Sequence, residues 1–309
     1  MPIKIANDLP ARKILEDENI FVMTEERAMI QDIRPLKIII LNLMPTKIAT
    51  ETQLLRVLSN SPLQIEVDFL QTATYRGKHT SESHLSAFYK VFGGICQNKY
   101  DGMIITGAPI EHMEFEEVDY WDELRQIMDW TRRNVYSTLH ICWGAQAALY
   151  HHFGVGKHIR PDKLSGVYPH KVLEPLHPLI RGFDDVFMAP HSRNSEIWAE
   201  DIAGYDELVT LAASDEAGAA IIAHKNGRQF FCSGHQEYDR DTLAGEYFRD
   251  VNKGLNPDVP KNYFPGDDPA ANPNVTWRAH ANLLFSNWLN YYVYQQTPYD
   301  LNQLLKIDN

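Results

Sequence analysis

Cysteine is scarce in this sequence: its 309 residues include three, Cys96, Cys142 and Cys232. An odd and sparse set does not form a disulfide framework and fits a reducing compartment. Basic residues are also few, since 29 lysines and arginines face 41 acidic residues and leave a formal net charge of −12. This charge argues against nucleic-acid or membrane-surface binding through bulk electrostatics, although a small anion needs only a local basic pocket.

Long apolar runs are missing as well. No stretch approaches the ~18 apolar residues of a membrane span. Residues 1–20 carry charges throughout and have no apolar core, so we expect no signal peptide. We therefore expect a cytoplasmic protein with neither a membrane nor a nucleic acid among its partners. The chain can bury a sizeable hydrophobic core, because 44% of its residues are hydrophobic. α/β enzymes of this length often form one unit.

Short aliphatic runs alternate with amphipathic stretches through the first half of the chain. The aliphatic runs predict strands at 36–43, 65–70, 101–107 and 135–141. The other stretches predict helices at 49–58, within 81–99, at 119–133 and from 144 onward. This alternation predicts an α/β fold with a mostly parallel sheet and helices on both faces.

The remaining segments divide the chain into an extension and a domain. Residues 1–34 have helical character but no clear place in a sheet, and we interpret them as an N-terminal extension for packing or subunit contact. Residues 35–309 are expected to form the catalytic α/β domain. Its second half is less regular, with prolines at 161, 169, 175, 178 and 190. Short strands are expected at 208–214, 219–224 and 228–234, with a hairpin turn at 225–227, a long loop at 251–275 and a closing helix at 277–296.

Cys142 stands where a predicted strand, 135–141, meets a predicted helix that starts at Gly144. A side chain on such a turn projects from the end of the sheet, and the free N–H groups of the helix point at it. Both effects favour a thiolate, which is the nucleophilic form of cysteine. We interpret Cys142 as a catalytic nucleophile, and the alternative is an ordinary buried cysteine.

A nucleophilic cysteine in acyl transfer needs a histidine base and a group that orients it. His235 directly follows the predicted strand 228–234, and Glu237 is close enough to hydrogen-bond its ring. We expect His235 to reach the same rim of the sheet as Cys142. The alternative is a loop histidine beside a surface charge.

An oxyanion hole requires two N–H donors near the reacting carbonyl. The backbone N–H of Trp143 is one candidate, and the loop 106–109, which contains Ala108, can supply the other. The alternative for that loop is a plain turn. We expect no metal site, because His151 and His152 are adjacent and should diverge on a helix, and Cys232 with His235 lacks a second pair at zinc spacing.

A helix is also expected within 238–250, after the proposed base. Glu246 and Arg249 share a face of that helix, so Arg249 is available either for a substrate carboxylate or for an ion pair with Glu246. Lys163, Ser192 and Arg193 lie in the proline-rich segment. Their spacing indicates no more than polar loop residues.

Two motifs together resemble the class I glutamine amidotransferase-like fold: CWGAQ at 142–146 and HQE at 235–237. His140 replaces the glycine that usually precedes the cysteine by two residues, and Gln236 replaces a proline, which argues against a plain glutaminase. The sequence is more similar, from end to end, to homoserine O-acyltransferases of methionine biosynthesis. That resemblance rests on LNLMPTKIATETQLLRVLSN, TGAPIEHMEFEEVDYW, HICWGAQAALYHHFG, MAPHSRNSE and SGHQEYDRDTLAGEY.

The resemblance implies an amidotransferase-like catalytic domain, a homodimer and a ping-pong reaction. Cys142 would carry the acyl group as a thioester, His235 would act as general base and Glu237 would orient it. The substrate-binding positions of the family fall on Lys163, Ser192 and Arg249. No cofactor or metal is implied, because acyl-CoA is the donor substrate and homoserine the acceptor.

Position 111 follows the acyl donor in the family: glycine accompanies succinyl-CoA and glutamate accompanies acetyl-CoA. Glu111 in this chain, with Ser192, therefore implies acetyl transfer. The physics agrees, because a carboxylate beside the acyl pocket would repel the terminal carboxylate of a succinyl group. The alternative for Glu111 is a solvated loop charge. The resemblance predicts a homoserine O-acetyltransferase, with succinyl transfer, a cysteine amidohydrolase and a non-enzymatic binding protein as rivals.

Overall fold

The structure is a computed structural model that describes residues 3–6, 8–18, 22–24, 34–74 and 80–306. Its strands are β1 Ile3–Ile5, β2 Val22–Thr24, β3 Leu36–Leu41, β4 Ile65–Gln71, β5 Tyr89–Val91, β6 Tyr100–Ile105, β7 Val135–Ile141, β8 His158–Val172, β9 Val186–Glu196, β10 Leu208–Ser214, β11 Gly218–His224 and β12 Gln229–Cys232. Its α-helices are α1 Pro10–Asp17, α3 Lys47–Ser59, α4 Glu82–Phe88, α5 Phe92–Ile95, α6 Trp121–Asn134, α7 Trp143–Phe153, α8 Ala199–Ala203, α9 Thr242–Asn252 and α10 Arg278–Asn287. A π-helix, Trp288–Tyr294, continues α10, and short 3-10 turns occupy Phe115–Glu117, Pro178–Ile180, Pro265–Asp267 and Leu301–Lys306.

One sheet runs through the described residues in the order β2-β1-β4-β3-β6-β7-β12-β11-β10-β8-β9, with β5 beside β4. The pairs from β2 to β12 are parallel, and so is the pair of β4 with β5. The pairs from β12 to β9 are antiparallel. The prediction of a mostly parallel α/β sheet is therefore confirmed.

Helices cover both faces of this sheet, as predicted. Ile38 and Ile40 of β3 point to one face, where they share a core with α1, α3 and α10. Ile39 and Leu41 point to the other face, where they share a core with α6 and α7. This alternation follows from the period of two in a strand, and it explains why the buried strands read as continuous aliphatic runs.

Two parts of the first half differ from expectation. The N-terminal segment was expected to have no clear place in the sheet, but β1 and β2 pair with each other and β1 pairs with β4. Strands of three residues are too short to show a period of two. The helix expected within 81–99 is interrupted, because β5 separates α4 from α5. Pairing with β4 at Phe69–Tyr89 overrides the helical preference of that segment.

The proline-rich segment after α7 is the largest correction. It contains the long antiparallel pair of β8 and β9. Pro190 lies on β9 at the edge of the sheet, and the register between β8 and β9 shifts between Ile159 and Leu164, around Pro161. Edges and bulges are where strands tolerate proline. Pro169 lies outside the short pairing of β8 with β10, which involves Lys171 and Val172.

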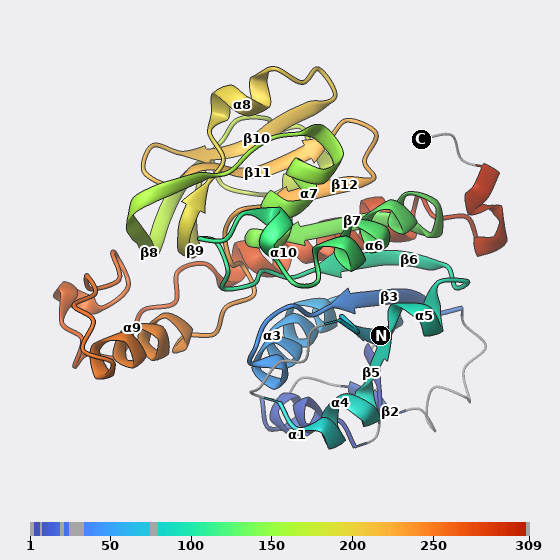
Figure 1. Cartoon of the computed structure of the whole chain (residues 1–309), viewed down its shortest axis with the longest axis horizontal. Coiled ribbons are helices and arrows are strands. Elements are labelled where there is room, and N and C mark those ends of the chain that lie inside the picture. Colours follow the sequence, from blue (N-terminus) through green and yellow to red (C-terminus); the bar gives the residue numbers. More distant parts are fainter. Residues whose placement is uncertain (1–2, 7, 19–21, 25–33, 75–79, 307–309) are drawn as a thin grey trace.

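The carboxyl ends of the parallel strands share one rim. In Figure 1 the arrows of β3, β6 and β7 point toward the side of the molecule where β8, β9 and α9 lie. Ligands bind at this rim in open α/β sheets. None of the helices in the described ranges combines the length and apolarity needed to cross a bilayer.

Candidate active site

Cys142 occupies the turn between β7 and α7, in the middle of the sheet. Its φ is 51° and its ψ is −119°, a conformation that strains any residue other than glycine. Its backbone N–H donates to the carbonyl of Cys232 at 2.7 Å, which ties the turn to the end of β12. Such a strained strand-to-helix turn presents its side chain above the sheet. The side chain is buried, with 3% of the residue exposed.

Two glycines allow the turn to pack closely against β6. A Cβ atom on Gly144 would lie 2.5 Å from the carbonyl oxygen of Thr106, so only glycine fits there. A Cβ atom on Gly107 would lie 3.2 Å from Cβ of Cys142 and 3.5 Å from Cε1 of His235. The loop after β6 therefore lies directly against the side chains of Cys142 and His235.

His235 reaches the same rim because β12 lies beside β7 and runs parallel to it. Its Nδ1 atom lies 2.7 Å from Oε1 of Glu237, and its ring also hydrogen-bonds the Cys142 side chain. Burial by itself would lower the pKa of His235, but the charges of Cys142 and Glu237 raise that pKa well above its usual value. The three side chains form one buried line from sulfur through imidazole to carboxylate.

The two expected oxyanion donors flank this line. Trp143 is the first residue of α7, so its N–H has no acceptor one turn earlier in the helix. Ala108 follows Gly107 in the loop after β6 and is buried. Trp143 is thus the immediate neighbour of Cys142, and Gly107, the residue before Ala108, lies against the Cys142 side chain. The role of both N–H groups as oxyanion donors stays a prediction.

Lys163 and Ser192 meet at one carboxylate of α9. The Nζ atom of Lys163 lies 3.3 Å from Oε2 of Glu246, and the Ser192 hydroxyl donates to the same oxygen. The Tyr238 hydroxyl donates to Oε1 of Glu246 at 3.2 Å. The ring of Tyr238 stacks on the ring of His235, with centroids 4.1 Å apart. Tyr238 therefore connects the Glu246 cluster to the imidazole.

Arg249 lies on the same helix and pairs with its neighbour Asp250 rather than with Glu246. Its guanidinium donates to both carboxylate oxygens of Asp250, at 2.8 and 3.0 Å. Its side chain is 52% exposed, so it is accessible to a ligand. In place of the ion pair with Arg249 that the spacing allowed, the Glu246 carboxylate accepts hydrogen bonds from Lys163 and Ser192.

Glu111 follows Ala108 by three residues in the loop after β6. It is 7% exposed, and the Lys157 ammonium donates to its backbone oxygen at 2.8 Å. Glu111 is therefore a buried carboxylate and not the solvated loop charge that remained as the alternative.

The two adjacent histidines do not diverge as the sequence suggested. The ligating atoms of Asp129, His151 and His152 lie within 4.8 Å of one another. His151 uses its Nε2 atom for Asp129, at 2.7 Å, and burial lowers the pKa of His152 to about 3. These residues lie at the far end of α7 from Cys142. The absence of a metal from the reaction stays a prediction.

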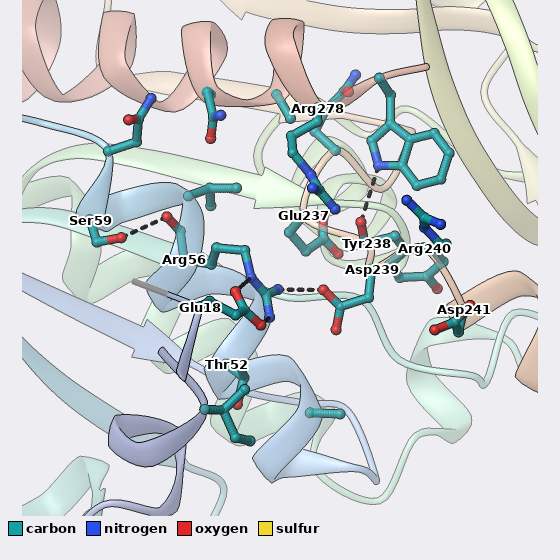
Figure 2. Close-up of a pocket in the computed structure, with 18 of the residues that line it drawn as sticks. Glu18, Thr52, Arg56, Ser59, Glu237, Tyr238, Asp239, Arg240, Asp241 and Arg278 are labelled. Carbon is teal, nitrogen blue, oxygen red and sulfur yellow. Dashed lines mark hydrogen bonds and ion pairs between the residues drawn. The ribbon is translucent and has the colours of Figure 1, made fainter. Parts of the chain in front are cut away.

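A cavity of about 1170 Å³ is lined in part by Glu237, Tyr238 and Asp239. Figure 2 shows Arg56 of α3 between Glu18 and Asp239 on its wall, with Glu237 and Tyr238 behind them. Arg56 donates to Glu18 at 2.6 Å and also to Asp239, four residues after His235. The wall thus connects the loop that carries the imidazole to α3 and to the end of α1.

The structure places Tyr238 and Arg193 near the predicted catalytic residues, and the sequence analysis did not single out either of them as a site residue. Tyr238 directly follows the HQE motif, and an aromatic ring at that position was a signal of stacking on His235. Arg193 is 1% exposed, although its segment suggested a polar loop. No pattern in the sequence indicates its burial, because β9 was not predicted.

A solved glutamine amidotransferase from Thermotoga maritima resembles this chain in fold, with a TM-score of 0.55 and 10% identity. The match covers 85% of this chain and all of that one. The chain has a class I glutamine amidotransferase-like fold.

The sequence comparisons are more specific. A family model described as homoserine O-succinyltransferase matches residues 2–299. A protein from Acetivibrio thermocellus named homoserine O-acetyltransferase is 59% identical over 98% of this chain and 100% of its own length. A protein of the same name from Brevibacillus brevis is 61% identical over 98% of this chain and 99% of its own. The chain belongs to the homoserine O-succinyltransferase family of acyltransferases.

Proposed function

We propose that this chain is a homoserine O-acetyltransferase, which transfers the acetyl group of acetyl-CoA to the hydroxyl of L-homoserine. The observation that carries the proposal is the buried line Cys142–His235–Glu237 at the rim of the sheet. The family of the chain and the names of its relatives support the assignment of homoserine and acetyl-CoA as substrates. The products are O-acetyl-L-homoserine and CoA.

In the first half-reaction, the Cys142 thiolate attacks the thioester carbonyl of acetyl-CoA. The N–H groups of Trp143 and Ala108 donate to the developing oxyanion. Collapse forms an acetyl thioester on Cys142 and releases the CoA thiolate, which takes a proton from the His235 imidazolium. His235 is then neutral, as the second half-reaction requires.

In the second half-reaction, His235 takes the proton of the homoserine hydroxyl as its oxygen attacks the acetyl thioester. Collapse expels the Cys142 thiolate and restores the thiolate–imidazolium pair. Glu237 keeps the imidazole oriented throughout. Arg249 would exchange Asp250 for the carboxylate of homoserine, with Lys163 and Ser192 as further substrate contacts.

Acetyl transfer is favoured over succinyl transfer by Glu111. A buried carboxylate near the acyl pocket would repel the carboxylate of a succinyl group, whereas an acetyl group is small and neutral. The family model is described as homoserine O-succinyltransferase, so succinyl-CoA is the second candidate donor.

We further propose a cytoplasmic homodimer that serves methionine biosynthesis and needs neither cofactor nor metal. We take residues 35–309 as its catalytic domain and 1–34 as an N-terminal extension. These assignments rest on family resemblance.

A paired-donor assay tests the proposal. We expect turnover with acetyl-CoA to exceed turnover with succinyl-CoA, and Glu111→Gly to shift the preference toward succinyl-CoA. Cys142→Ala should abolish turnover, and the wild type incubated with acetyl-CoA alone should gain the mass of one acetyl group on Cys142. Ammonia release from glutamine would indicate an amidohydrolase instead, and no activity with an unmodified Cys142 would indicate a binding protein.

A further inference from the structure

Arg193 is a buried cation on β9 with neutral hydrogen-bond acceptors. Its Nη1 and Nη2 atoms donate to the backbone oxygens of Ser195 and Ala217, each at 2.6 Å. Its Nε–H donates to Nδ1 of His191 at 3.4 Å, which requires that nitrogen to be unprotonated. These bonds fix the guanidinium in place without neutralising its charge.

The carboxylate of Glu196 lies near Arg193 but is shared. It lies 3.7 Å from the Arg193 guanidinium, and Arg160 bonds the same oxygen more closely. Arg160 and Glu196 are both partly exposed, and they pair with each other more closely than Glu196 pairs with the buried Arg193. A buried charge is costly unless an opposite charge compensates it.

The face of β9 that carries Arg193 packs against both elements of the active site. His191, Arg193 and Ser195 share this face, because side chains alternate along a strand. The Ser195 hydroxyl donates to Oε1 of Gln146 in the first turns of α7, at 2.7 Å. A Cβ atom on Gly234 would lie 3.1 Å from the His191 ring, and the backbone N–H of His235 donates to the carbonyl of Pro190.

The catalytic line has the complementary charge in the state that the proposed mechanism requires. A thiolate on Cys142, an imidazolium on His235 and a carboxylate on Glu237 would then sum to one negative charge, and all three residues are buried. Arg193 donates to His191, whose ring lies against Gly234 next to His235, and this arrangement brings the guanidinium toward the catalytic line. Burial lowers the pKa of Arg193, and the charge of Cys142 opposes that change. His235 and Tyr238 also face Cys142, and Glu196 of β9 faces Arg193 together with Arg160 and Tyr168 of β8.

We propose that Arg193 is the counter-charge of the catalytic line: a positioning residue that keeps Cys142 ionised without touching the substrate. The role rests on the proposed function, since it matters only if Cys142 is the nucleophile. It predicts that removing the charge of Arg193 makes the thiolate harder to form.

Alkylation of Cys142 by iodoacetamide, followed by peptide mass spectrometry from pH 5 to pH 10, tests this role without any substrate. In Arg193→Met we expect the midpoint of the rate–pH profile to rise by about one pH unit, and the alkylation rate at pH values below the wild-type midpoint to fall about tenfold. Arg193→Lys restores the charge and should recover part of the shift. Cys232 does not interfere, because burial and the Glu237 carboxylate raise its pKa to about 12.

Arg228 provides the matched control. It is also buried, and it donates to the backbone oxygens of Tyr136 and Val135 at the start of β7, the opposite end of the strand from Cys142. Arg228→Met removes a buried guanidinium in the same way and should leave the alkylation midpoint of Cys142 at its wild-type value.

A midpoint for folded Arg193→Met equal to that of Arg228→Met would overturn the proposal. If Arg193→Met does not fold, Glu196→Gln tests the proposal through a shift in the opposite direction. Loss of that partly exposed carboxylate should lower the alkylation midpoint of Cys142. An unchanged or higher midpoint would overturn the proposal. If wild-type Cys142 reacts no faster than the half-buried Cys96, the nucleophile itself fails, and the role of Arg193 falls with the proposed function.

Discussion

Local chemistry at His235 depends on one carboxylate and one sulfur. The pKa of His235 is raised well above its usual value, although burial acts in the opposite direction. A group whose pKa rises on folding stabilises the fold fully below its unfolded pKa, and loses that contribution as the pH rises through the folded pKa. The ion pair of His235 with Glu237 should therefore also contribute to the stability of the fold at neutral pH.

Glu237→Gln keeps the size of the side chain and removes its charge. We expect kcat to fall by about 10²- to 10⁴-fold, because the imidazole loses the group that orients it. We also expect the loss of unfolding free energy to be larger at pH 6 than at pH 9, as measured by urea denaturation. Glu116→Gln is the control: its pKa is lowered by Tyr150, so its contribution should be constant over that interval.

A loss in Glu237→Gln that did not change between pH 6 and pH 9 would contradict the ionised pair.

At the scale of elements, the site depends on how closely α7 approaches the end of β6. Gly144 permits this approach, since any Cβ atom there would overlap the carbonyl oxygen of Thr106. The same approach places Gly107, the residue before Ala108, against the Cys142 side chain. The packing of α7 and the position of the loop that holds the proposed oxyanion donor Ala108 therefore depend on one contact.

Gly144→Ala should lower the free energy of unfolding by about 3 kcal/mol, because the added methyl must push α7 away from β6. Turnover should fall with it, since Trp143 moves with the helix. Gly245→Ala in α9 is the matched control: nothing lies within 4 Å of the added atom, and alanine is the better helix former by about 0.5–1 kcal/mol. Chemical denaturation of both variants measures the change in the free energy of unfolding, which should be negative for Gly144→Ala and positive for Gly245→Ala.

At the scale of the whole molecule, Arg56 connects three distant parts of the chain. It joins Glu18, after α1, to Asp239 in the loop that carries His235, and both partners approach it from different sides (Figure 2). Gln53, one turn earlier on α3, donates to Thr242 at the start of α9 at 2.9 Å. The loop of the proposed base is thus held by α3 as well as by its own strand.

Arg56→Ala should lower the free energy of unfolding by about 1–2 kcal/mol and reduce kcat, because the loop 235–241 loses its anchor. Lys171→Ala, which removes an exposed pair with Asp215, should change stability by no more than about 0.5 kcal/mol. Thermal unfolding and steady-state kinetics measure both effects. Equal kinetics in the two variants would show that α3 does not position the loop.

Much of the architecture followed from sequence. The aliphatic runs at β3, β6 and β7 identified a parallel sheet, because strands buried on both faces have no polar side. The turn at 225–227 was identified by its glycine, whose φ of 72° few other residues adopt. Cys142 and His235 were placed on one rim because both follow predicted strands, and the structure brings them together.

Tertiary structure alone decided the rest. β8 and β9 escaped prediction because prolines mask a strand, and their tolerance at an edge or a bulge depends on neighbours far along the chain. The positions of Arg193 and Tyr238 also depend on tertiary structure. Arg193 is placed by the pairing of β9 with β8, and Tyr238 is placed by its stacking on His235. Sequence fixes which side chains can ionise; the burial and the opposing charges that set their ionisation exist only after the chain has folded.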